Sequence, residues 1–200
     1  MSARDVVIIA SGGANIASLQ FALERLEVRS SVSADAARIG AASHVILPGV
    51  GAADDAMRRL RAAGLERLIP ALRQPVLGIC LGMQLLFGSS AEGPADCLGI
   101  IDGRAERLPA AGGLPVPHIG WNTLDTIGES PLLEGLRAGE YAYFVHSYAL
   151  PVGERTTAAT HYGRPFCACV QQGNFFGAQF HPERSAGLGA RVLRNFLGLA

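Results

Sequence analysis

The sequence has few cysteines, and none of its four, Cys80, Cys97, Cys167 and Cys169, belongs to a C-x-x-C pair. Without such pairs the chain lacks the usual pattern of a disulfide framework or a zinc site. We therefore expect no metal and no other cofactor. Scattered cysteines are typical of a reducing compartment, so the expected location is cytoplasmic.

An excess of one charge and long apolar runs are also missing. Seventeen basic and seventeen acidic side chains cancel, which gives no electrostatic reason to expect nucleic acid or a membrane surface as a partner. No apolar run approaches the length of a membrane span, and residues 1–5 lack the features of a signal peptide. With 49% apolar residues, positions 1–200 are expected to form one compact domain.

Strand and helix patterns alternate along the first ninety residues. Continuous apolar runs at Val6–Ala10, His44–Leu47 and Val76–Ile79 are typical of strands buried on both faces. Helical spacing of apolar residues follows over Ile16–Glu27 and Ala53–Ala63. This order predicts an α/β fold, in which a mostly parallel central sheet is flanked by helices.

The second half of the chain differs in composition and in its pattern of apolar residues. Residues 89–120 are rich in Gly, Pro and Ala and predict loop with short strands. Strands are expected at Tyr141–Tyr148, Pro165–Gln171 and Phe175–Phe180, as an antiparallel extension of the sheet, and a closing helix at Leu188–Leu197.

The stretch Gly78-Ile-Cys-Leu-Gly82 has the spacing of a G-x-S-x-G nucleophile elbow, with sulfur in place of oxygen. It lies between the strand Val76–Ile79 and an apolar helix expected to begin over Met83–Phe87. Glycines relieve the crowding around a strained nucleophile, and a helix N-terminus favours thiolate over thiol. The alternative is a buried structural cysteine in a strand-to-helix turn.

A histidine and an acid follow the strand Phe175–Phe180 directly, as His181 and Glu183. Ligands of open α/β sheets bind at the carboxyl ends of strands, where the elbow also places Cys80. Cys, His and acid are the parts of a covalent acyl-transfer site, in which His181 moves the proton and Glu183 orients the imidazole. Taken singly, each could instead be a strand-end histidine or an exposed charge.

The turn Pro48-Gly-Val-Gly51 ends another strand. Its backbone N–H groups, with that of Leu81, could form an oxyanion hole, although such a turn alone is weak evidence. Trp121 and Asn122 could cap the core or anchor an interface.

Two segments, Gly78–Gln84 and Gln179–Ser185, resemble the class I (triad) glutamine amidotransferase family. Pro48–Gly51, Pro117–Asn122 and Tyr143–Tyr148 resemble one branch of it, so the similarity covers nearly the whole chain. The resemblance implies a flavodoxin-like fold and hydrolysis of L-glutamine through a thioester. It also implies the catalytic residues Cys80, His181 and Glu183, and a substrate pocket built from Gly49, Val50, Gly51, Leu81, Gln84, Ser147 and Tyr148.

In that branch the partner is a (β/α)8-barrel cyclase, which receives ammonia within a heterodimer. Residues that match positions near the interface are Trp121, Asn122, Tyr143 and Arg184, although the family more often has Lys at the last. The first loop, Ala10–Asn15, departs from the family pattern, which affects any contact made there. Other readings are another triad amidotransferase subunit, of the pyridoxal phosphate synthase or anthranilate synthase type, and a catalytically silent binding subunit.

Overall fold

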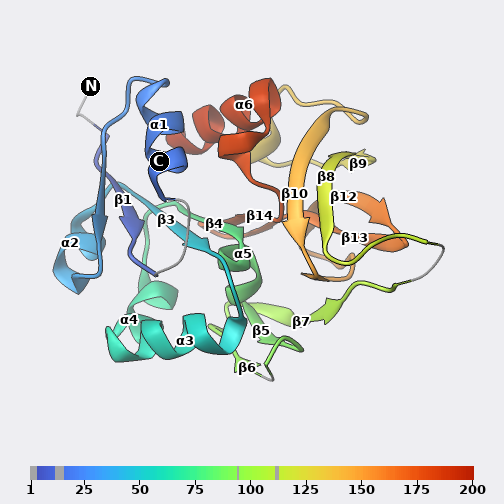
Figure 1. The fold of residues 1–200 in the computed structure, drawn as a ribbon. Helices are drawn as coiled ribbons and strands as arrows, with labels where there is room; N and C mark the ends of the chain where they lie inside the picture. The colour runs from blue at the N-terminus through green and yellow to red at the C-terminus, as the bar shows by residue number, and fades with distance from the viewer. Residues whose placement is uncertain (1–3, 12–15, 94, 111–112) are drawn as a thin grey trace.

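A computed structural model describes residues 4–11, 16–93, 95–110 and 113–200 (Figure 1). Its centre is an eight-stranded sheet with the order β2-β1-β3-β4-β14-β13-β12-β9. The strands are β1 (Val6–Ile9), β2 (Ser30–Ser33), β3 (His44–Gly49), β4 (Val76–Cys80), β9 (Thr126–Ile127), β12 (Thr156–Tyr162), β13 (Arg164–Gln172) and β14 (Phe175–Ala178).

Strand direction divides this sheet into two parts. β2, β1, β3, β4 and β14 are parallel to one another, whereas β13, β12 and β9 continue the sheet in antiparallel pairs. The predicted fold class, a single α/β domain with a mostly parallel sheet and an antiparallel extension, is confirmed.

Helices cover both faces of the sheet (Figure 1). In β1, Val6 and Ile8 pack into one hydrophobic core and Val7 and Ile9 into the other, as alternation along a strand requires. None of the helices in the described part of the chain is long and apolar enough to cross a membrane. One face carries α1 (Ile16–Glu24) and α6 (Ala186–Leu197), and the other α2 (Ala36–Ala41), α3 (Ala53–Ala62), α4 (Leu65–Leu68) and α5 (Leu81–Leu85).

Two smaller sheets lie beside the main one. The first pairs β8 (His118–Thr123) with β10 (Tyr141–His146), and the second has the order β11-β7-β5-β6. The prediction that Tyr141–Tyr148 extends the main sheet is therefore wrong. Apolar patterning indicates a strand, but its partner depends on contacts distant in sequence. The second sheet comprises β5 (Phe87–Ser90), β6 (Ala95–Asp96), β7 (Ile101–Arg107) and β11 (Tyr148–Ala149), and the 3-10 helices are η1 (Ile69–Ala71), η2 (Pro131–Leu133) and η3 (Pro182–Arg184).

One strand direction and two element boundaries also differ from the sequence prediction. β14 pairs parallel with β4, so it belongs to the parallel part and not to the antiparallel extension. β3 does not stop before Pro48 but runs on to Gly49. The helix expected over Met83–Phe87 ends at Leu85, because N–H groups of residues 98–101 bond the carbonyls of residues 85–87 and turn the chain into β5.

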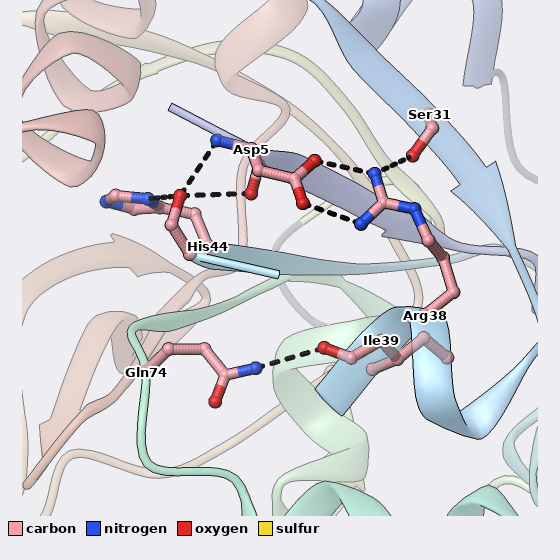
Figure 2. Close-up of polar contacts among 7 residues, drawn as sticks. Asp5, Ser31, Arg38, Ile39, His44 and Gln74 are labelled. Atoms are coloured by element: carbon pink, nitrogen blue, oxygen red, sulfur yellow. Dashed lines mark hydrogen bonds and ion pairs between the residues drawn. The ribbon is translucent and has the colours of Figure 1, made fainter. Parts of the chain in front are cut away.

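A polar cluster ties α2 to the amino-terminal edge of the sheet (Figure 2). The Arg38 guanidinium donates to both carboxylate oxygens of Asp5, at 2.5 and 2.6 Å, and to Oγ of Ser31 at 3.0 Å. These bonds hold the pKa of Asp5 below its usual range. The Gln74 amide caps α2 by donating to the Ile39 carbonyl. Because Asp5 directly precedes β1, the cluster lies at the edge opposite the carboxyl ends of the parallel strands.

Candidate active site

Cys80 ends β4 in a strained backbone conformation, with φ 54° and ψ −113°, and α5 begins at the next residue. A Cβ atom on Gly82 would lie 1.8 Å from the carbonyl oxygen of Leu47, and one on Gly78 would lie 2.7 Å from the oxygen of Gly82. Only glycine fits at these two positions. The elbow thus has the crowded geometry that the sequence spacing indicates.

His181 and Glu183 follow β14, which is parallel to β4, so both strands deliver their carboxyl ends to one edge. The Nδ1 atom of His181 lies 2.9 Å from Oε1 of Glu183, and since a carboxylate accepts, this nitrogen donates. The imidazole also forms a hydrogen bond with Cys80. The His181 N–H also donates to the Tyr143 carbonyl at 2.9 Å, which anchors the segment.

The His181 imidazole experiences opposing effects. Burial lowers its pKa, but hydrogen bonds with Cys80 and Glu183, reinforced by their negative charges, raise the pKa to about 10. The imidazole is consequently protonated at neutral pH and can donate a proton to a group bound over the sulfur.

A pocket of about 190 Å³ opens over the sulfur. Gly49 and Glu183 line a smaller hollow beside it. The structure thus brings most of the predicted substrate residues together with the triad. The residues that line the larger pocket are Val50, Gly51, Cys80, Leu81, Gln84, Glu92, Val145, His146, Ser147, Tyr148 and His181.

Four residues at this site were not singled out from the sequence. Val145 and His146 line the pocket, and both fall inside the Tyr143–Tyr148 segment, which offered a signal. Gln179 lies two residues before His181 and contacts the sulfur at 3.7 Å. Glu92 comes from a loop that carries no recognisable pattern; burial, with the nearby charge of Asp54, raises its pKa.

Three other cysteines lie elsewhere in the fold. Burial raises the pKa of Cys97 to about 11 and that of Cys167 to about 12. The pKa of Cys169 is also raised by burial. All are free, but none lines the pocket. Of the four cysteines, all of them described in the structure, Cys80 is the one that lines the pocket.

The predicted interface residues gather on the β8–β10 sheet and on η3. Trp121 is 52% exposed, and its ring packs edge-on against Tyr143 at 5.7 Å. The Arg184 guanidinium stacks over the same tyrosine at 5.0 Å. Asn122 instead donates its amide to the His161 carbonyl and ties β8 to β12. Trp121 is therefore a surface residue and does not cap the core.

At one end of this sheet, His118 and His146 form a buried pair, with Nδ1 of His118 3.1 Å from Nε2 of His146. His118 also stacks on the Tyr162 ring at 3.9 Å. Of the altered first loop, positions 12–15 lie outside the described residues.

The family described as "Glutamine amidotransferase class-I" matches residues 9–199. "Imidazole glycerol phosphate synthase subunit HisH" of Xanthomonas euvesicatoria is 54% identical over 196 residues, which is 98% of each chain. The protein of the same name from Vibrio parahaemolyticus is 46% identical over the whole of both chains. Among solved structures, PurLQS from Thermotoga maritima covers 98% of each chain with a TM-score of 0.75 at 20% identity, which is evidence for the fold.

The chain therefore belongs to the class-I glutamine amidotransferase family. Within that family it is similar over its full length to the HisH subunits of imidazole glycerol phosphate synthase.

Proposed function

We propose that this chain is the glutaminase subunit of an imidazole glycerol phosphate synthase, a single amidotransferase domain over residues 1–200 that supplies ammonia in histidine biosynthesis. The observation that carries the proposal is the contact of Cys80, His181 and Glu183 at one edge of the sheet, beneath a pocket. Similarity to HisH subunits over 98% of the chain adds the biosynthetic context.

In the proposed reaction the sulfur of Cys80 attacks the side-chain carboxamide carbon of L-glutamine. His181 holds the thiol proton and then delivers it to the departing nitrogen, so the C–N bond breaks, ammonia leaves and a γ-glutamyl thioester remains. A water molecule then attacks the thioester, with His181 now accepting the proton. The C–S bond breaks, glutamate leaves and the thiol is restored. Glu183 stabilises the imidazolium throughout.

The negative oxygen of the tetrahedral intermediates needs hydrogen-bond donors. We assign this role to the N–H of Leu81 and to N–H groups of the segment from Gly49 to Gly51, which lies against the elbow because Gly49 pairs with Cys80. A segment whose N–H groups point elsewhere would leave the charge without donors. We therefore expect low glutaminase activity from the subunit alone.

Substrate binding is assigned to the polar rim of the pocket. Oε1 of Gln84 is buried without a hydrogen-bond partner, so an N–H donor on the substrate would satisfy it. The carboxylate of Glu92 suits the α-ammonium group of glutamine, and the backbone of Ser147 and Tyr148 lines the opposite wall.

The name of the relatives describes them as one subunit of a synthase, which supports a partner subunit for this chain. We propose a (β/α)8-barrel cyclase in a heterodimer. Its docking surface would be centred on Trp121, Tyr143 and Arg184, where an exposed aromatic ring lies beside a cation close to the site. Four free cysteines support a cytoplasmic location.

The test is to purify the chain with its barrel partner and to compare Cys80→Ser with the parent. The variant should lose glutamine-dependent synthesis and keep ammonia-dependent synthesis, since the partner's chemistry needs only ammonia. Cys97→Ser is the matched control and should retain both. Loss of both activities in the Cys80 variant, or glutamine turnover that survives it, contradicts the proposal.

A further inference from the structure

A chain of buried amides runs beneath the sulfur, outside the triad. Gln179 is fully buried after β14, and its Nε2 lies 3.7 Å from Sγ of Cys80. Its Oε1 lies 2.9 Å from Nε2 of Gln84, which in turn lies 2.8 Å from the carbonyl oxygen of Tyr148. The reaction steps described above do not use Gln179.

The orientation of each amide in this chain follows from its last member. A backbone carbonyl can only accept, so Gln84 must present its NH2 group to Tyr148. The same NH2 group reaches Oε1 of Gln179, which must accept. The end of Gln179 that remains for Cys80 is therefore its NH2 group. Reversing the Gln179 amide would place two NH2 groups against each other.

The anchoring carbonyl is itself held by a second donor. Nδ1 of His146 lies 2.9 Å from the Tyr148 oxygen and must donate to it. The Nε2 of His146 is then an acceptor, and it takes a hydrogen bond from Nδ1 of His118 at 3.1 Å. All the hydrogen-bond roles along this chain, from His118 to the sulfur, are thus determined.

We propose that Gln179 is a positioning residue that donates an N–H hydrogen bond to the thiolate form of Cys80. The proposal rests on the proposed function in that Cys80 is the nucleophile. The neutral S–H group has its own acceptor in the Val145 carbonyl, 3.6 Å away. The thiolate cannot use a carbonyl and needs donors. The Gln179 amide thus favours the anion, and orients it beside His181.

Other titratable groups face the pocket around the sulfur. His181 comes from the segment after β14, with Glu183 behind it, His146 comes from β10, and Glu92 from the loop after β5. The side-chain amide of Gln179 bonds to Gln84 and Cys80 and to none of these four groups, so its effect on the sulfur can be separated from theirs.

The first experiment measures the rate of Cys80 carbamidomethylation by iodoacetamide against pH, with the modified peptide identified by mass spectrometry. Gln179→Met keeps the chain length and removes the donor. The pH of half-maximal rate should move upward by about one unit, a tenfold change, as expected for loss of one hydrogen bond to a charged group. Glutamine hydrolysis by the complex should lose about tenfold in kcat.

Gln172→Met is the matched control. Gln172 lies in the neighbouring strand β13, at the end far from Gln179, and its amide donates one hydrogen bond to the Ile100 carbonyl. This variant should leave the alkylation profile unchanged. Equal profiles for the parent and Gln179→Met would overturn the proposal. The alkylation assay needs no glutamine turnover, so it reports on Gln179 even if the proposed enzymatic function fails.

A second measurement uses the unsubstituted protein, in case Gln179→Met does not fold. The side-chain amide resonances of Gln179 in a ¹⁵N-labelled sample should shift with pH at the midpoint of the alkylation profile, while those of Gln172 stay constant. Gln179 resonances that do not change through that midpoint would also overturn the proposal.

Discussion

Acid should destabilise this fold through the buried pair His118 and His146. Burial lowers the pKa of His118 to about 4. For His146, burial and then the neighbouring imidazoles of His118 and His181 outweigh the bond to the Tyr148 carbonyl and lower the pKa to about 3. In the unfolded chain an imidazole has a pKa near 6.5. Both groups are therefore neutral in the fold over a pH range in which the unfolded chain is protonated.

The sign and size of the effect follow from proton linkage. Because the folded pKa values are depressed, the stability they confer is complete above pH 6.5 and is lost as pH falls toward 4 and 3. At pH 5 each unfolded imidazole is almost fully protonated and each folded one is neutral, which costs about 2 kcal/mol per histidine. Together the pair removes about 4 kcal/mol, a large part of a typical stability of about 5–15 kcal/mol.

Three other titratable groups also contribute over this pH range. His181 has a raised pKa, so its contribution falls as pH rises from 6.5 toward 10 and is constant below 6.5. His44 has its pKa lowered chiefly by burial and adds to the acid loss. Glu92, whose pKa is raised, opposes the loss only as pH falls through its own titration.

The assay is urea unfolding at several pH values between 7.5 and 5.0, for the parent and His118→Phe. Phenylalanine keeps an aromatic ring against Tyr162 and cannot titrate. Across this range the parent should lose about 2 kcal/mol more than the variant, because the contributions of His181 and of the other titratable groups are common to both. His161→Gln, at an exposed position, is the control and should follow the parent. Equal slopes for the parent and His118→Phe would refute the reasoning.

Two further predictions concern the elbow and the triad. Gly82→Ala should lower the free energy of unfolding in urea by about 3 kcal/mol or more, because the new Cβ meets the β3 backbone. Gly40→Ala, which has open space in α2, should raise it by about 0.5–1 kcal/mol. Similar unfolding midpoints for the two variants would contradict the crowding at Gly82. Glu183→Gln should lower the pKa of His181, read by imidazole NMR titration, and slow glutamine hydrolysis by about 100-fold or more. An unchanged pKa would remove Glu183 from its role.

Local patterns predict β1, β3 and β4 well because these strands are buried on both faces, although the patterns miss the parallel direction of β14. Val6–Ile9 and Val76–Cys80 are continuous apolar runs, and their register follows once helices cover each side. The half-exposed strands are harder. Thr156–Tyr162 reads as a polar segment in the sequence, although it forms β12 and pairs along β13. Its stability comes from neighbours that the local pattern does not reveal.

The same contrast between local patterns and distant contacts applies to the residues of the candidate site. Cys80, His181 and Glu183 could be proposed from the sequence because each lies next to a strand end or a glycine elbow, where position and residue type are coupled. Glu92 could not, since it reaches the pocket from a loop whose course depends on the small β5–β6–β7 sheet. The donor role of Gln179 also needs the chain of contacts through Gln84, which spans 95 residues of sequence.

The strained backbone at Cys80 is held by central strands, so the errors in predicting the outer strands do not affect its position. A non-glycine residue at φ 54° costs of order 1–3 kcal/mol and persists only where its surroundings over-determine it. Here β3 pairs Gly49 with Cys80 on one side, and β14 pairs Ala178 with Ile79 on the other. The backbone of Gly82 meanwhile abuts the Leu47 carbonyl. These contacts all belong to central strands and α5, so the elbow depends on the part of the fold that sequence patterns specify best, and the smaller sheets supply the walls of the pocket around it.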